Sequence, residues 1–270
     1  MSEVKTTSLA AFGSQLRSWR QQMGWTQVET GDKLGYSASL ISGIETTDKT
    51  PTADFAARCD KTFGAPGTFA TLQELVSREA YPAFFAPVVP FEREAVRIHA
   101  WHLGAVPGLL QTEEYARAVV RQGQPAAPED EVGRRVALRT RRQQVLSRPS
   151  APRLWAVVDE GALRRPMGGR DVMRGQVERL MAATREPNIT LQVLPFTFGG
   201  HAAEGGAFTI MRFPEADMGD VVYIEQLTGA LYLDKREDVE RYSEVMERLS
   251  VKATSPDRTQ DILAAILKEL

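Results

Sequence analysis

Side chains able to transfer protons or to bind a metal ion could gather at a few places in this 270-residue chain. The candidates are Asp159, Glu160, His201, Glu204 and Glu225, together with His99 and His102, which are three residues apart. Residues at that spacing share a face of a helix but point to opposite sides of a strand, and this segment has a strand pattern. No activated serine, catalytic cysteine setting, phosphate-binding loop or metal-ligand cluster accompanies them. We therefore expect no catalytic residue, no metal and no cofactor.

A second chemical motif is a pair of arginines followed by two glycines: Arg164, Arg165, Gly168 and Gly169. They precede a helix predicted over residues 171–184. The free N–H groups and the dipole at the start of a helix attract anions, and the arginines would add positive charge. An anion or partner site is one interpretation. The alternative, which is the commoner origin of such a motif, is a plain loop with a helix cap.

The strongest pattern of the chain lies between residues 12 and 51. Apolar residues recur there at spacings of four, three and four, which predicts a helix ending at Gly24. The residues of this stripe are Phe12, Leu16, Trp19 and Met23. Thr26 and Glu29 then form a capping box, in which each side chain satisfies a free backbone N–H group, so a second helix is expected over residues 27–34.

A short third helix is predicted between Ser37, a suitable N-cap, and Glu45. Its inner side would be formed by Ile41 and Ile44, because these residues are apolar and three apart. Pro51 and Thr52 open a fourth helix that buries an apolar face and stops at Gly64. A third helix of about nine residues is marginal alone, so packing must hold it in place.

These residues resemble the Cro/cI-type (xenobiotic-response-element-like) helix-turn-helix transcriptional regulators. The similar positions are Leu16, Arg17, Gly24, Thr26, Gln27, Leu34, Gly35, Ser37, Ile41, Ser42, Ile44, Glu45 and Pro51. In that family the second helix crosses the DNA backbone and the third enters the major groove. The resemblance implies that base edges face Ala38, Ser39, Ser42 and Gly43. It implies that phosphates contact Gln27, Ser37, Thr46 and Lys49.

Small residues dominate the outward side of the predicted third helix. None of the four base-facing residues can make the bidentate contacts of Arg, Asn or Gln, so we expect thymine methyl groups, hydroxyls and DNA shape to carry recognition. Gly43 removes a base contact that a long polar side chain would make. Thr30 and Gly31 predict a second helix that is less well packed and less helical. Thr47 would make a left-handed turn more costly than glycine would.

Charge in this region predicts weak DNA binding by a single copy. Between residues 12 and 51 four basic residues (Arg17, Arg20, Lys33 and Lys49) balance four acidic ones (Glu29, Asp32, Glu45 and Asp48). Nonspecific affinity grows with the number of phosphates that are neutralised. A single module also buries only roughly 600–1,000 Å² on DNA. We therefore expect a homodimer that binds double-stranded DNA at paired half-sites.

Composition is that of an ordinary globular protein, with 43% hydrophobic and 25% charged residues and a net charge of −2. The single Cys59 cannot form an internal disulfide, which fits a reducing compartment. The first residues lack the layout of a signal peptide, and no apolar run approaches the ~20 residues that cross a bilayer. These features predict a cytoplasmic location without membrane contact.

The chain is long enough for two domains. We expect a helix-turn-helix domain over residues 1–68, a helical, proline-interrupted connector over 69–94, and a second domain over 95–270. Strands are predicted in the second domain over 95–103, 154–158, 189–194, 207–213, 221–227 and 230–233. A capped helix would follow Asp234 and Glu237, and another would begin at Ser255–Pro256 with Ile262, Ile266 and Leu270 on one side. The expected fold class is α+β, an all-α bundle followed by a mainly antiparallel sheet flanked by helices.

Four strings of the second domain carry a further resemblance: VPGLLQTEEYARAV, LWAVVDEGALRRPMGG, ITLQVLPFTFGGH and VVYIE. They are similar to the C-terminal domain of uncharacterised function that follows this helix-turn-helix in many actinomycete regulators, often described as toxin–antitoxin antitoxin-like. The resemblance implies a small partner protein encoded nearby.

Three functional hypotheses remain open from the sequence. The first is a sequence-specific DNA-binding transcriptional regulator whose C-terminal domain mediates dimerisation and binds the small partner. The second is an antitoxin-like interaction module that neutralises such a partner directly. The third is a regulator that senses a small molecule.

Overall fold

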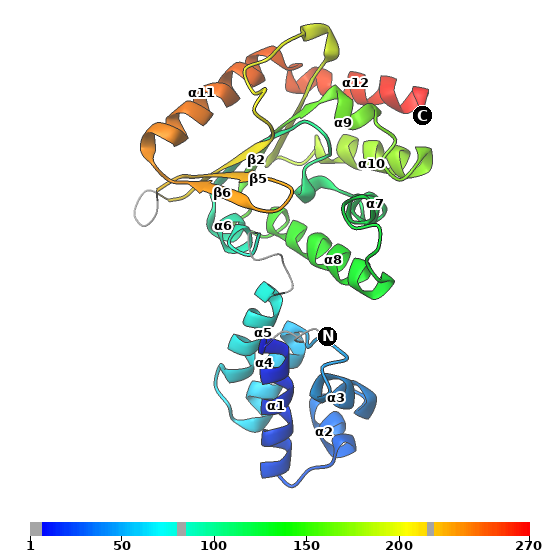
Figure 1. Cartoon of the computed structure of the whole chain (residues 1–270), viewed down its shortest axis with the longest axis vertical. Coiled ribbons are helices and arrows are strands. Elements are labelled where there is room, and N and C mark those ends of the chain that lie inside the picture. The colour runs from blue at the N-terminus through cyan, green and yellow to red at the C-terminus, as the bar shows by residue number, and fades with distance from the viewer. Residues whose placement is uncertain (1–6, 80–84, 215–218) are drawn as a thin grey trace. The chain divides into compact units, whose positions relative to one another are not determined.

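The computed structural model describes residues 7–79, 85–214 and 219–270. The chain divides into two compact units, residues 1–86 and 87–270, each of which has its own core (Figure 1). Part of the expected connector, residues 80–84, lies outside the described residues.

The N-terminal unit consists of helices α1 (Thr7–Gln22), α2 (Gln27–Leu34), α3 (Ala38–Glu45), α4 (Ala53–Phe63) and α5 (Thr68–Glu79). The C-terminal unit begins with α6 (Val88–Glu94), β1 (Arg97–His102), η1 (Gly108–Leu110), α7 (Glu113–Gly123), α8 (Glu129–Arg142), η2 (Gln143–Leu146), β2 (Arg153–Asp159), α9 (Glu160–Arg164) and α10 (Arg170–Ala183). It continues with β3 (Ile189–Leu194), η3 (Phe196–Phe198), β4 (Phe208–Arg212), β5 (Val221–Glu225), β6 (Ala230–Leu233), α11 (Arg236–Lys252) and α12 (Pro256–Glu269).

An aromatic cluster forms the centre of the N-terminal unit. The ring of Phe12 on α1 lies 6.2 Å from that of Phe55 on α4 and 5.3 Å from that of Phe69 on α5. Phe69 and Val76 are buried in this core, so the helix expected in the connector packs against α1 and α4. Such rings bury much apolar area, which stabilises helices too short to persist alone.

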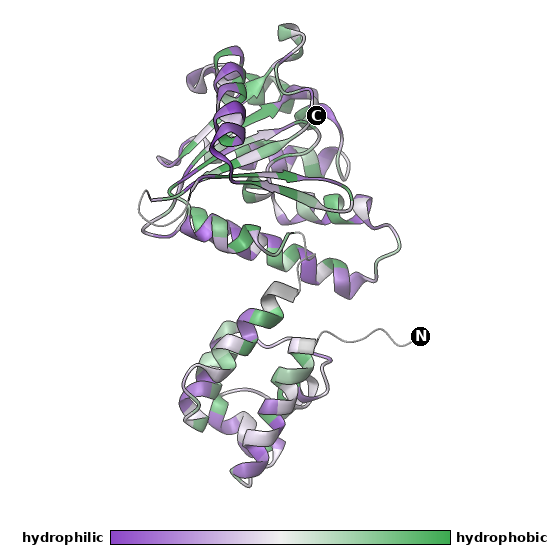
Figure 2. Ribbon diagram, turned by 60° about the vertical axis from the view of Figure 1, so that its left-hand side comes forward, coloured by the Kyte–Doolittle hydropathy of each residue, from purple (hydrophilic) through white to green (hydrophobic). Residues whose placement is uncertain are grey.

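The C-terminal unit is built on one six-stranded sheet with the strand order β3-β2-β1-β4-β5-β6. β1, β2 and β3 pair in parallel, and the remaining pairs, β1 with β4, β4 with β5 and β5 with β6, are antiparallel. The sheet is therefore mixed but mostly antiparallel, and the chain is α+β, as the sequence predicts. Hydrophobic residues concentrate on the strands (Figure 2).

The two faces of the sheet are covered differently. α11 packs on one face, where Val239, Met246 and Leu249 join a core containing Trp101 and Ile210. The opposite face is also largely apolar, with Ile98, Leu154 and Met211 buried, but it carries His102 and Tyr223 close to the arginines of α8. Since successive residues of a strand alternate between faces, β1 contributes to both layers.

Several local expectations are wrong. Met23 is the first residue after α1, which ends at Gln22, and its side chain is 39% exposed, so it does not join the buried stripe. Asp234 does not cap α11, which begins at Arg236 after Lys235 and has no side-chain cap. On α12, Ile266 is buried as expected, but Thr259 and Leu263 are buried in place of Ile262 and Leu270, because this side of the helix packs against α10 and β3.

The turn after α3 contains a strained residue. Among the described residues Thr47 is the one non-glycine residue with positive φ, at 64°. A branched side chain in this left-handed region approaches the backbone closely, which costs roughly 1–2 kcal/mol per residue.

Replacing Thr47 with glycine should therefore raise the free energy of unfolding of the N-terminal unit by about 1 kcal/mol, after allowing for the greater freedom of glycine in the unfolded chain. Urea denaturation of the whole chain, followed by hydrogen exchange in peptides from residues 7–76, measures this. Thr50→Gly makes the same chemical change at an ordinary backbone angle and should lower stability slightly. Equal effects at both positions would contradict the assignment of strain to Thr47.

Candidate nucleic-acid interface

α3 is a short helix with one side buried and the other exposed. Ser37 caps it by accepting a hydrogen bond from the backbone N–H of Leu40 at 3.3 Å. Ile41 and Ile44 are completely buried. Because these anchors fix the rotation of the helix, its small residues are turned outward. The expected helix, cap and buried side are all confirmed.

α2 is held by local contacts that the sequence predicts in part. The capping box of Thr26 and Glu29 is present. Gly31 corrects our expectation of poor packing, since a Cβ atom added there would lie 2.5 Å from the carbonyl oxygen of Tyr36. Gly31 and its neighbour Thr30 are both buried. The missing side chain therefore allows the turn to α3 to pack closely against α2.

A glycine of α1 performs a similar role for α3. A Cβ atom at Gly13 would lie 2.6 Å from the carbonyl oxygen of Ile44, a distance that real Cβ contacts do not show. The backbones of α1 and α3 thus touch at this point, which places the end of α3 directly against α1.

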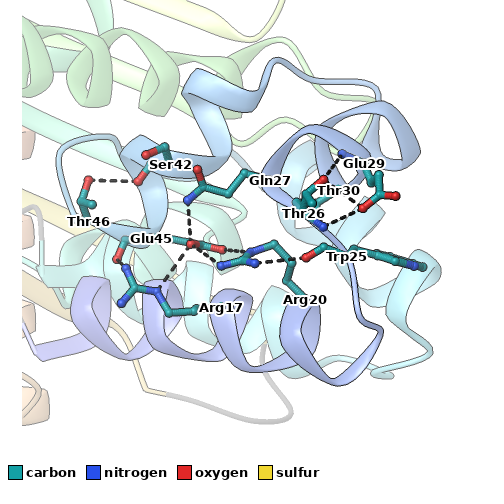
Figure 3. A network of polar contacts seen from close by, with 10 residues as sticks. All are labelled: Arg17, Arg20, Trp25, Thr26, Gln27, Glu29, Thr30, Ser42, Glu45 and Thr46. Atoms are coloured by element: carbon teal, nitrogen blue, oxygen red, sulfur yellow. Dashed lines mark hydrogen bonds and ion pairs between the residues drawn. The ribbon is translucent and has the colours of Figure 1, made fainter.

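A buried carboxylate joins the three helices (Figure 3). The side chain of Glu45 is fully buried and accepts hydrogen bonds from Arg20 Nε at 2.6 Å and Nη2 at 3.0 Å. Gln27 on α2 donates to the same carboxylate at 3.0 Å. Arg17 Nε lies 3.5 Å from Glu45 Oε2. Arg20 also donates to the carbonyl oxygen of Trp25 at 3.1 Å, so the network includes the turn between α1 and α2.

The electrostatics of this network favour the ionised carboxylate. Burial is the largest influence and by itself would raise the pKa of Glu45. The hydrogen bonds from Arg20 and Gln27, with the charges of Arg20 and Arg17, outweigh it and hold the pKa below its ordinary value. The hydrogen bond to Glu45 in turn raises the pKa of Arg20. The pair is therefore charged at neutral pH, and its attraction acts in a partly water-excluded site.

The expected base-facing residues lie together on the outer side of α3. Ser39 is exposed, and Ala38, Ser42 and Gly43 are partly exposed. Of the expected phosphate contacts, Ser37, Thr46 and Lys49 are exposed. Thr46 Oγ1 lies 2.9 Å from the carbonyl oxygen of Ser42. Gln27 differs from the others, because its amide group already binds Glu45.

Sequence reasoning missed the partners that orient this surface. The pairing of Arg20 with Glu45 was missed because the two residues are 25 positions apart, and the close backbone approach at Gly13 has no local pattern. The presence of Arg20 and Glu45 on the inward sides of α1 and α3 was the available signal.

The arginine and glycine motif of the second unit is arranged differently from an open anion site. Arg164 forms an ion pair with Glu160 at 2.5 Å and another with Glu269. Gly168 and Gly169 adopt positive φ angles of 74° and 95°, which turn the chain into α10. The loop interpretation explains these angles, and the charge of Arg164 is already balanced by two carboxylates. Arg165 is exposed.

His99 and His102 lie on β1 and face opposite sides of the sheet. His99 packs edge-on against Trp155 at 5.6 Å, and burial lowers its pKa to about 4. Burial also lowers the pKa of His102 to about 4, with the charges of Arg142 and Arg139 acting in the same direction. Both rings are thus neutral at pH 7. Within the described residues, no group of three or more His, Cys, Asp or Glu side chains is placed to hold a metal ion.

Comparison with known protein families identifies the family of the second unit. Residues 85–265 match a model described as a domain of unknown function, DUF5753. The chain belongs to the DUF5753 family. The matched segment begins just before α6 and ends within α12, so it spans the whole DUF5753 sheet. No helix in the described part of the chain combines the length and apolar character needed to cross a membrane.

The first unit matches a second model. Residues 11–72 correspond to a helix-turn-helix domain, which covers α1 to the beginning of α5. This DUF5753 protein therefore carries the type of domain found in DNA-binding regulators. Neither the curated proteins nor the solved structures contain a match to the chain.

Changing Glu45 to glutamine should lower the free energy of unfolding of the N-terminal unit by about 3 kcal/mol, because it leaves Arg20 partly buried without its counter-charge. The variant should also lose less stability at acidic pH, because it no longer carries the Glu45 carboxylate. Since folding lowers the pKa of Glu45, its ionised form stabilises the fold above the ordinary carboxyl pKa, and this stabilisation is lost as pH falls.

Urea denaturation between pH 3 and 7, roughly spanning the carboxyl range, measures both effects. Asp32→Asn removes the same charge from an exposed position of α2 and should change little. A Glu45→Gln variant as stable as the unchanged protein would show that the network does not hold α3.

Proposed function

We propose that this protein is a sequence-specific DNA-binding transcriptional regulator of the Cro/cI type. The observation that carries the proposal is the outer side of α3, a rigidly held helix with an exposed surface of small residues. Small side chains let a helix backbone approach base edges closely, as a helix in the major groove must. The helix-turn-helix match of residues 11–72 supports it.

The proposal includes a homodimer. Four acidic residues balance the four basic ones between residues 12 and 51. Glu45 and Arg20 are paired inside the unit, so their charges cancel and the remaining basic and acidic residues still balance. Since phosphate neutralisation supplies most of the nonspecific affinity, one copy would bind weakly. Two copies on paired half-sites would supply the missing contacts.

We propose that the DUF5753 domain supplies this dimer contact and binds a small partner protein, as in toxin–antitoxin antitoxin-like regulators. β6 supports the proposal, because it is an edge strand of the sheet. Leu231 on this strand is 50% exposed, and Leu227 in the turn before it is 94% exposed. A sheet edge can accept an additional strand, and neighbouring apolar side chains favour such docking. In this proposal the chain acts in the cytoplasm and by binding, not by catalysis.

Ser39→Glu should weaken binding to a duplex from the region upstream of the protein's own gene by about 100-fold or more. The new carboxylate would lie where α3 meets the negative groove, and like charges at an interface cost several kcal/mol. Fluorescence polarisation at fixed salt measures the affinity.

Ser14→Glu is the matched control, since Ser14 is exposed on α1 beside the start of α5. This variant should bind within a few-fold of the unchanged protein. Undiminished binding by Ser39→Glu would reject the placement of α3 in the groove.

A chain ending at Ala86 should be a monomer and should not capture the partner, because it lacks the DUF5753 domain. Sedimentation and co-purification with the small protein encoded nearby measure the two properties, with the whole chain as the reference. Capture of the partner by the shortened chain would show that the docking surface is elsewhere. A dimer of the shortened chain would place the self-contact in the first unit.

A further inference from the structure

A positive charge lies on the outer side of α3, although no residue of that helix carries one. It belongs to Lys49, which follows the helix. The Nζ atom of Lys49 donates to Ser39 Oγ at 3.5 Å, across a separation of 10 residues. The ammonium group is therefore placed near the beginning of α3, on the same side as the small exposed residues.

The stem of Lys49 lies over Gly43. A Cβ atom added to Gly43 would lie 2.8 Å from both Cγ and Cδ of Lys49. Any side chain at position 43 would thus displace the lysine. The absence of a side chain at Gly43 removes one contact to DNA from the helix and at the same time gives the Lys49 stem a place to lie.

The turn after α3 directs Lys49 back over the helix. The backbone N–H groups of Asp48 and Lys49 both donate to the carbonyl oxygen of Gly43, at 2.7 and 2.9 Å. Thr46 Oγ1 donates to Asp48 Oδ2 at 2.6 Å, and Thr47 adopts the positive φ that reverses the chain. Lys49 therefore starts from a fixed backbone position and is not a free surface lysine.

We propose that Lys49 recognises a guanine base in the major groove and supplies the long polar side chain that α3 lacks. The inference rests on the DNA-binding function proposed above. An ammonium group has three donors and no acceptor, and guanine presents two acceptors, O6 and N7, in the major groove. Cytosine presents a donor there, which an ammonium group cannot pair with. The ammonium lies 3.5 Å from Ser39 Oγ, among the expected base-facing residues, whereas a phosphate contact would be expected at the rim of the surface.

Selection of bound sequences from a pool of random duplexes tests this inference with the whole chain. The unchanged protein should enrich guanine at one position in each half-site. Lys49→Met keeps most of the apolar stem and removes the charge, so the preference for guanine at that position should fall by roughly ten-fold while the rest of the motif remains. Lys49→Arg should retain the preference, because arginine also pairs with O6 and N7.

Two further variants separate position from charge. Gly43→Ala keeps the lysine but displaces its stem, and it should lose the same guanine preference. Lys61→Met removes an exposed lysine from α4 and should leave the motif unchanged. Thermal unfolding of each variant confirms that it is folded before selection.

Other results of the selection experiment would contradict either the role of Lys49 or the DNA-binding function itself. An equal loss of affinity for all sequences in Lys49→Met would identify a phosphate contact and overturn the inference. A motif unchanged in Lys49→Met, or altered at a base other than guanine, would overturn it as well, while leaving the DNA-binding function intact. If the unchanged protein enriches no sequence, the proposed function fails and the inference fails with it.

Discussion

The buried carboxylate of Glu45 is the constraint on which the geometry of the N-terminal unit depends. It lies at the end of α3 and receives hydrogen bonds from Arg20 on α1 and Gln27 on α2. A charge taken out of water must be paired. Glu45 can therefore stay buried only while α1 and α2 hold Arg20 and Gln27 against it. The hydrogen bonds of this ion pair are directional, whereas the burial of Ile41 and Ile44 is not. Burial fixes which side of α3 faces inward, and the ion pair fixes where the helix ends.

Glycine has two separate roles around α3. At Gly13 and Gly31 the absence of a side chain permits close backbone contact, so these residues belong to the packing of the unit. At Gly43 it leaves room on the outer side for the stem of Lys49. The strained turn at Thr47 also helps to place Lys49 over Gly43, because it returns the chain over the helix. Strain of this kind persists when the surrounding contacts compensate for it, and here it positions a charge.

The DUF5753 domain buries both faces of a single sheet. α11 covers one face, while Glu92 and Arg142 form a buried ion pair at 3.0 Å on the other side. The free edge at β6 is remote in sequence from the helix-turn-helix residues. The proposed function assigns DNA contact and protein contact to different units of the chain, so each surface can be altered separately in experiments.

Local patterns of residues were enough to predict most helices and strands of this protein. Caps such as Thr26 with Glu29, and the three-residue spacing of Ile41 and Ile44, act over one or two helical turns, so they predicted α2 and α3 with their correct ends and buried sides. The alternation of apolar residues likewise located the strands of an α+β fold. The burial of Glu45, the close packing at Gly31 and the position of Lys49 across Gly43 became apparent from the folded arrangement alone. These facts depend on partners brought together by folding, and no local pattern encodes a distance between residues that are far apart in the chain.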